Sequence, residues 1–81
     1  MLRAHRDEVI RQIVGSGGVL FSDGADGRQC FLAAPVVVRE QIVGVIGVEP
    51  SVRQEWTQND IRLIQAVAER AALAVENARL Y

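Results

Sequence analysis

The chain has 81 residues, of which 49% are hydrophobic and 23% charged, so it makes one small domain with a narrow margin of stability. Its formal net charge of −1 removes the usual electrostatic basis for nucleic-acid binding, and its single cysteine excludes an internal disulfide. The longest apolar run lies within residues 43–48, far short of the about 18 residues of a membrane helix, and no secretory signal is visible. We therefore expect a cytoplasmic protein that binds neither membrane nor nucleic acid.

A first helix is predicted over residues 2–14, because its apolar residues share one face. Val9, Ile10, Ile13 and Val14 follow helical i, i+1, i+4, i+5 spacing, and charged or polar residues fill the opposite side. The glycine-rich segment that follows is typical of a helix end. This helix should therefore bury one side against the rest of the domain.

Three or four antiparallel strands are predicted in the central part of the chain. Pro35 cannot donate a ladder hydrogen bond, so we expect it at a strand start or on an edge. Residues 36–38 and 42–48 are rich in β-branched side chains and predict a hairpin. Gly44 and Gly47 interrupt the second of these strands, where a neighbouring backbone or helix is expected to approach closely.

The last helix has the clearest signals. Thr57 is predicted as its N-cap, and Asp60 imitates the acidic residue of a capping box. An apolar stripe then recurs at spacings of three and four: Ile61, Ile64, Ala68, Ala71, Val75 and Ala78. Because Leu63, Val67 and Ala74 widen this stripe, the helix has enough apolar width for two partners, one of them another subunit.

Four strings occur in order along the chain: LAAPVVV at 32–38, IVGVIGV at 42–48, WTQND at 56–60 and AVENARLY at 74–81. Together they resemble the C-terminal part of a GAF domain, a small-molecule sensor module of bacterial signalling proteins and phosphodiesterases. The resemblance implies a partial GAF/PAS-like α+β fold, an antiparallel sheet of three to four strands flanked by an N-terminal and a long C-terminal helix. It also implies a sensor or regulatory role in bacterial signal transduction.

The front of the chain departs from the family pattern. GAF domains usually begin with a further helix and two strands, for which residues 1–14 leave no room, so residues 1–81 are expected to form one truncated or degenerate GAF-like domain. Missing strands would leave an exposed edge, most naturally along residues 42–48. We therefore expect a homodimer, formed by strand pairing or swapped helices, whose interface includes the helical stripe Ile61, Ile64, Ala68, Ala71, Val75 and Ala78.

Ligand contacts are expected only by position within the family. They would come from Phe21, Asp23, Cys30 and Phe31. Cys30 by itself is expected to be a small buried hydrophobe rather than an attachment point for a chromophore. Trp56 is expected to be a hydrophobic staple against the last helix rather than a stacking surface for a ligand.

No catalytic constellation is evident. Thiol-based reduction needs an attacking and a resolving cysteine, whereas Cys30 is the only cysteine and His5 has no evident nucleophilic partner. We expect no enzyme activity and no cofactor. Two functions remain open: a ligand-binding sensor, and a structural dimerisation module that has no working ligand pocket.

Overall fold

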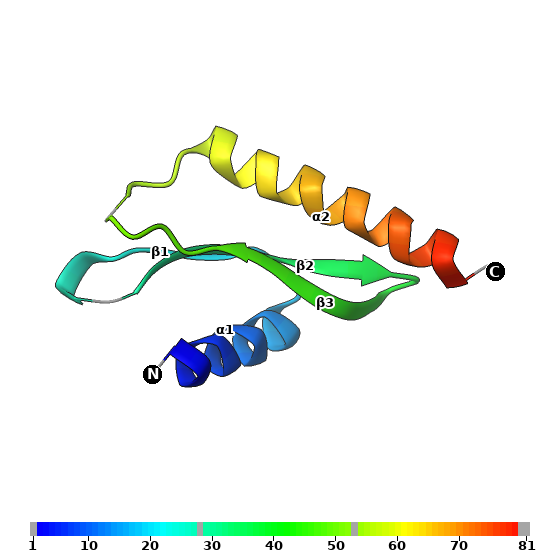
Figure 1. The fold of residues 1–81 in the computed structure, drawn as a ribbon, viewed down its shortest axis with the longest axis horizontal. Coiled ribbons are helices and arrows are strands. Elements are labelled where there is room, and N and C mark those ends of the chain that lie inside the picture. The colour runs from blue at the N-terminus through cyan, green and yellow to red at the C-terminus, as the bar shows by residue number, and fades with distance from the viewer. Residues whose placement is uncertain (1, 28, 53, 80–81) are drawn as a thin grey trace.

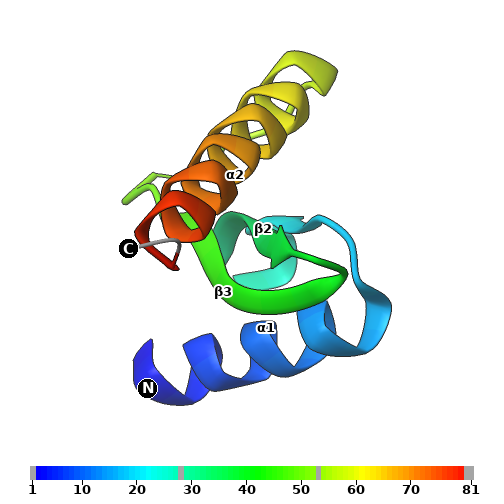
Figure 2. The same cartoon turned by 90° about the vertical axis from the view of Figure 1, so that its right-hand side faces the viewer.

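The computed structural model describes residues 2–27, 29–52 and 54–79. Its elements in chain order are the helix α1 (Leu2–Ser16), the strand β1 (Leu20–Asp23), the 3-10 turn η1 (Ala25–Gly27), the strands β2 (Cys30–Val38) and β3 (Gln41–Val48), and the helix α2 (Gln58–Arg79). The sheet is the middle layer, with α1 on one face and α2 on the other (Figures 1 and 2). The predicted α+β class is confirmed, with three strands.

The sheet is antiparallel and has the order β1-β2-β3. β1 pairs with the first half of β2 only, from Asp23 opposite Cys30 to Leu20 opposite Ala33. β3 pairs along nearly all of β2, with one irregularity in the register where β2 passes from Val36 to Val37. The strand predicted to be exposed is therefore at an edge of the sheet.

Pro35 lies inside β2 and opposite Val45, so the expected position at a strand start is wrong. The register with β1 ends at Ala33, and the half of β2 that contains Pro35 has β3 as its one paired neighbour among the described residues. The expectation of an edge position therefore holds locally. A strand tolerates proline where one of its sides has no ladder to complete.

β2 connects two small hydrophobic cores because its side chains alternate between the two faces of the sheet. Leu32 and Ala34 pack towards α2, in a cluster that includes Ile64 and Ala68. Ala33 points the other way and packs with Val9 and Ile13 of α1. A strand buried on both faces has few polar positions, which explains its nearly continuous apolar sequence.

The two glycines of β3 differ in their surroundings. A Cβ atom added to Gly47 would lie 3.2 Å from the carbonyl oxygen of Leu32 and 3.3 Å from the Cβ of Ala33, so the predicted close approach is confirmed there. For Gly44 the prediction is wrong, because a Cβ atom at this position would have no neighbour within 4 Å.

The capping box predicted for α2 is present. The Thr57 backbone N–H donates to Asp60 Oδ2 at 2.9 Å, and the Asp60 N–H donates to Thr57 Oγ1 at 3.2 Å. Trp56 and Ile61 both pack against the core cluster of Leu32 and Ile64, and the indole Nε1–H of Trp56 donates to the Ser22 carbonyl oxygen at 2.9 Å. The start of α2 is therefore held by hydrogen bonds within its own first turn and by one hydrogen bond to β1.

Thr57→Ala is expected to lower the free energy of unfolding by about 1 kcal/mol, since one of the two reciprocal capping bonds is lost. Thr57→Ser keeps a hydroxyl at the same position and should retain most of the stability. Urea denaturation followed by circular dichroism measures both variants. Equal losses for alanine and serine would contradict a capping role for the hydroxyl group.

Candidate functional site

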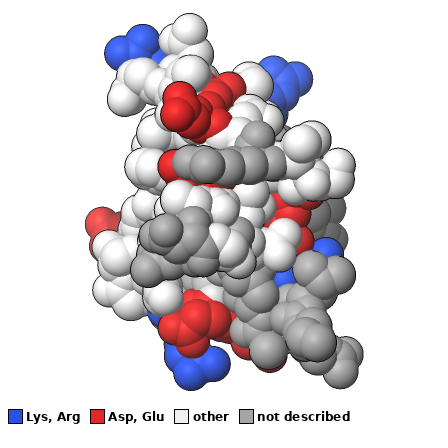
Figure 3. Space-filling view, turned by 90° about the vertical axis from the view of Figure 1, so that its left-hand side faces the viewer, with Lys and Arg blue, Asp and Glu red and all other residues white. Residues whose placement is uncertain are grey.

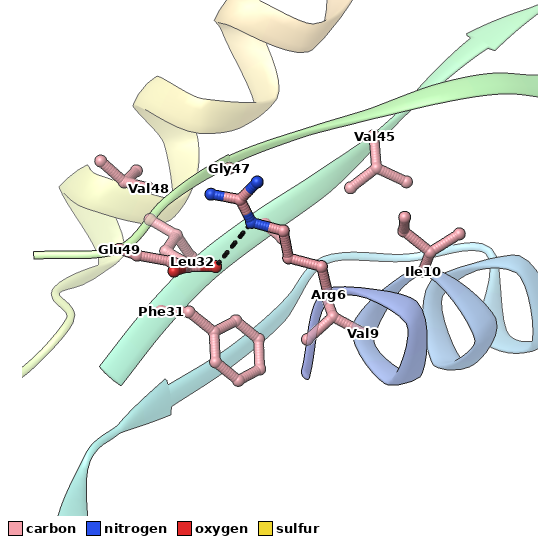
Figure 4. A pocket seen from close by; sticks show the side chains of 10 residues that line it. Arg6, Val9, Ile10, Phe31, Leu32, Val45, Gly47, Val48 and Glu49 are labelled. Atoms are coloured by element: carbon pink, nitrogen blue, oxygen red, sulfur yellow. Dashed lines mark ion pairs between the residues drawn. The ribbon is translucent and has the colours of Figure 1, made fainter. Parts of the chain in front are cut away.

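A pocket of about 510 Å³ opens between α1 and β3; we call it the α1–β3 pocket (Figure 4). Residues of α1, β2 and β3 line it: Arg6, Val9, Ile10, Phe31, Leu32, Ala33, Val45, Gly47, Val48 and Glu49. The pocket exists because α1 docks through Val9 and Ile13 against Ala33 of the central strand. α1 does not cover β3 completely, so the sheet stays partly open next to β3 on this side.

The lining of the α1–β3 pocket is polar and apolar in nearly equal parts. Phe31 and Val45 belong to the hydrophobic cluster on the α1 side of the sheet and form part of the lining. Gly47 also belongs to the lining, at the position where its backbone lies close to Leu32 and Ala33 of β2. Such a mixed lining suits a small molecule that has both an apolar and a polar part.

One ion pair crosses the mouth of the pocket. Arg6 reaches from α1 towards the segment after β3, and its Nε lies 3.8 Å from Glu49 Oε1 (Figure 4). The Arg6 side chain is 67% exposed and that of Glu49 26%. Pairs of this kind contribute at most about 1 kcal/mol, so a ligand that carries its own charge can replace either partner.

The four ligand-binding residues predicted by position do not come together. Phe31 lines the α1–β3 pocket. Phe21, Asp23 and Cys30 lie on the opposite face of the sheet, because Phe21 pairs with Leu32 and Asp23 with Cys30. Residues paired in an antiparallel ladder share a face, so these three point towards the α2 side.

The local contacts of the residues on that other face are structural. The Ala25 N–H donates to Asp23 Oδ1 at 2.8 Å, which orders the turn after β1. Cys30 is buried, as predicted, and its thiol donates to the Gln54 carbonyl oxygen at 3.8 Å. Phe21 is about half exposed. Their proposed role in ligand binding stays a prediction.

The stripe of α2 that was predicted to form a dimer interface faces the sheet of its own chain. Ile64 and Ala68 are buried in the core cluster with Leu32, and Ile61 and Ala71 pack against that cluster. Val75 is half-buried and Ala78 is exposed. The role of this stripe between subunits stays a prediction, but much of it already has a partner within the chain.

A second pocket of about 640 Å³ lies beside α2. It is lined by the glycine segment after α1, by the second half of β2, and by one flank of α2: Gly17, Gly18, Val19, Ala34, Pro35, Val37, Gln65, Ala68, Glu69, Ala72, Leu73 and Glu76. Glu76 is engaged with Arg39, whose Nε lies 3.6 Å from Glu76 Oε1.

Neither acidic nor basic side chains predominate on the face shown in Figure 3. Acidic and basic side chains of the described residues are interspersed there. Within the described ranges, no three or more His, Cys, Asp or Glu side chains are grouped to hold a metal ion. None of the helices described is both long enough and apolar enough to cross a membrane. The side chain of His5 lies outside the described residues.

Sequence reasoning missed the two charged residues of the α1–β3 pocket. Arg6 lies one turn before Val9 and Ile10 on the helix, so its position next to the buried face could be predicted from periodicity. Glu49 directly follows the edge strand, but no local signal joins it to α1. The pair forms only because α1 packs across the sheet.

Comparison with known proteins gives one match. No curated protein matches the chain, and no solved structure does. The family model for the GAF domain matches residues 2–77, which includes both helices and all three strands. The chain therefore belongs to the GAF domain family, a family of sensor and regulatory domains.

Proposed function

We propose that this domain is a small-molecule sensor of a bacterial signal-transduction protein, that it is cytoplasmic and non-enzymatic, and that it acts through a homodimer. The observation that carries the proposal is the α1–β3 pocket, which combines apolar side chains such as Phe31 with a replaceable ion pair between Arg6 and Glu49. Its volume of about 510 Å³ lies within the range that small-molecule sites commonly occupy.

The chemistry of the pocket favours a ligand with an apolar or aromatic body and one anionic group. The body would lie against Phe31 and Val45, because removal of their apolar surfaces from water favours binding. The anionic group would approach the Arg6 guanidinium and displace Glu49. Because Arg6 and Glu49 come from different elements, such a ligand would change the contact between α1 and the end of β3.

β2 offers a route from the pocket to α2. Phe31 and Ala33 face the pocket, while Leu32 and Ala34 alternate with them and support α2 on the opposite face. A shift of β2 that accommodates a ligand would therefore move the surface on which α2 rests. This supports a mechanism in which α2 carries the response to whatever follows it.

The first test measures binding of a probe with the expected chemistry, 2-naphthoate, by two-dimensional NMR. We expect shifts at the amides of Phe31, Val45 and Gly47. Arg6→Gln should weaken binding about threefold to tenfold, since it removes a partly exposed charged contact. Arg11→Gln is the matched control, because Arg11 is an exposed arginine of the same helix that lies away from the pocket.

Native mass spectrometry of the protein purified from its own host complements the titration, because it detects a retained ligand of unknown identity. Absence of a bound molecule together with unchanged pocket resonances would contradict the sensor function. That result would favour the structural dimerisation module.

A further inference from the structure

The turn between β2 and β3 has a strained backbone. Val38 is opposite Gln41 in the register, so Arg39 and Glu40 form a two-residue hairpin turn. Both turn residues have positive φ angles, 51° for Arg39 and 67° for Glu40, although neither is a glycine. Turns of this type strongly favour the sequence Asn-Gly, because other side chains are disfavoured in the left-handed region. The chain therefore holds two residues in a conformation that their own side chains oppose.

A second irregularity lies close to this turn. Val43 has no partner in the register, because its neighbours Ile42 and Gly44 are opposite the adjacent residues Val37 and Val36. An extra residue of this kind is a β-bulge, which bends its strand and increases the local twist. The bulge lies between the turn and the β3 residues that line the α1–β3 pocket. The turn end of the hairpin is thus the irregular part of the β2–β3 ladder.

The same turn contacts α2 near the C-terminal end of the helix. Ile64 and Ala68 are buried in the core cluster, but in the described part of the helix no side chain after Ala68 is buried. Figure 1 shows the β2–β3 turn at the end of the molecule where α2 also ends. There the Nε of Arg39 lies 3.6 Å from Glu76 Oε1. The strained turn therefore supplies a contact to the part of α2 that has no fully buried side chain.

This contact is easily broken. The side chains of Arg39 and Glu76 are 73% and 40% exposed, and ion pairs at such exposed positions are weak. Left-handed non-glycine residues persist where the surrounding structure holds them, and they are frequent in segments that switch between conformations. A weak contact made from a strained turn is released by a small rearrangement, as an element with two conformations of similar free energy requires.

We propose that the ion pair between Arg39 and Glu76 is a releasable tether, through which the β2–β3 turn controls the C-terminal part of α2. While the pair is formed, this part of the helix is held on the hairpin, and its release lets these helical turns open locally. The effect of a ligand rests on the proposed function. A ligand that lies against Val45 would move β3 beside the bulge, and the movement would reach Arg39 through the turn.

The first test compares amide hydrogen exchange with stability, without any ligand. Arg39→Asn combined with Glu40→Gly gives the turn its favoured sequence and removes the tether. We expect the urea midpoint of unfolding to rise, whereas the amides of residues 73–78 of α2 should exchange about twofold to fivefold faster, the factor that one exposed ion pair supplies. A turn without a controlling role would slow exchange in α2 together with the rest of the domain. Unchanged or slower exchange at residues 73–78 therefore overturns the proposal.

Single variants separate the tether from the strain. Glu40→Gly retains Arg39, so it should raise the urea midpoint and leave the exchange of residues 73–78 unchanged. Glu76→Gln removes the same ion pair from the side of the helix and should accelerate this exchange as the double variant does. Glu69→Gln is the matched control, because Glu69 lines the second pocket like Glu76 but forms no ion pair with a described residue. Equal acceleration by Glu69→Gln would overturn the proposal.

2-Naphthoate tests the ligand-dependent part. At saturation we expect exchange at residues 73–78 to change by about twofold or more in the wild type, and to stay unchanged in Glu76→Gln, whose α1–β3 pocket is intact because Glu76 does not line it. Binding that leaves α2 unchanged in the wild type would overturn control of the tether by the ligand. Absence of binding would contradict the proposed function instead, while the exchange rates without ligand still decide whether the tether exists.

Discussion

Replacement of Ile13 by alanine is expected to lower the free energy of unfolding by about 2–5 kcal/mol, the range for removal of a large buried aliphatic side chain. Ile13 is 0% exposed and is the largest fully buried side chain among the described residues. It attaches α1 to the sheet together with Val9 and Ala33, in a cluster with few other members. In a domain of 81 residues, a loss of this size is a large part of the total stability.

The next residue provides the control for this prediction. Val14 lies on the same helix but is 58% exposed, so Val14→Ala should change the free energy of unfolding by no more than about 0.5 kcal/mol. Urea denaturation at one fixed protein concentration, followed by circular dichroism, compares the two variants with the wild type. Similar effects of both changes would contradict the packing of α1 on the sheet through Ile13.

Much of the fold follows from local signals in the sequence. The helical spacing of Val9 and Ile13 identifies both α1 and the side that it buries. Thr57 and Asp60 mark the start of α2 because their capping bonds involve residues three apart. These features are predictable since the interactions that create them lie within one turn of helix.

The length of β2 was less predictable, because pairing between strands decides it. Pro35 indicates a boundary on local grounds, yet β3 pairs on both sides of it and the strand continues. The proline is tolerated because β1 stops at Ala33, and nothing near Pro35 in the sequence reveals where β1 stops. Tertiary pairing therefore overrides the local preference.

The candidate site also combines features that the sequence predicts with features that only the folded structure reveals. Alternation along β2 already places Cys30 and Phe31 on opposite faces, so the sequence contained a reason to separate them. The contact between Arg6 and Glu49 has no such signal, because it depends on how α1 crosses the sheet. A pocket formed between elements distant in sequence needs the packed structure to be found.

The sequence predicts the apolar stripe of α2 correctly, but the spacing of these residues does not show which surface the stripe contacts. Periodicity shows that a helix face is apolar and does not show whether a sheet or another subunit covers it. Within this chain Ile64 and Ala68 lie against β2. The side chains of Leu63 and Val67 lie on a different flank of α2 and are exposed. The apolar surface of α2 is wide because it includes both the face that packs on β2 and this exposed flank.

Ile64→Ala tests this division of α2 and is expected to lower the free energy of unfolding by about 2–5 kcal/mol. The side chain of Ile64 is buried among Leu32, Ala34 and Ala68, so its removal leaves a cavity between α2 and the sheet. Leu73→Ala is the control, because Leu73 is an exposed residue of the same helix and should lose no more than about 0.5 kcal/mol.

Urea denaturation measures both variants at several protein concentrations, because a contribution from dimer dissociation changes with concentration whereas the stability of each subunit does not. If Ile64 served mainly between subunits, its replacement would change the dissociation constant and leave the unfolding of the monomer almost unaltered. A large loss of stability that does not depend on protein concentration would instead place Ile64 in the core of each subunit.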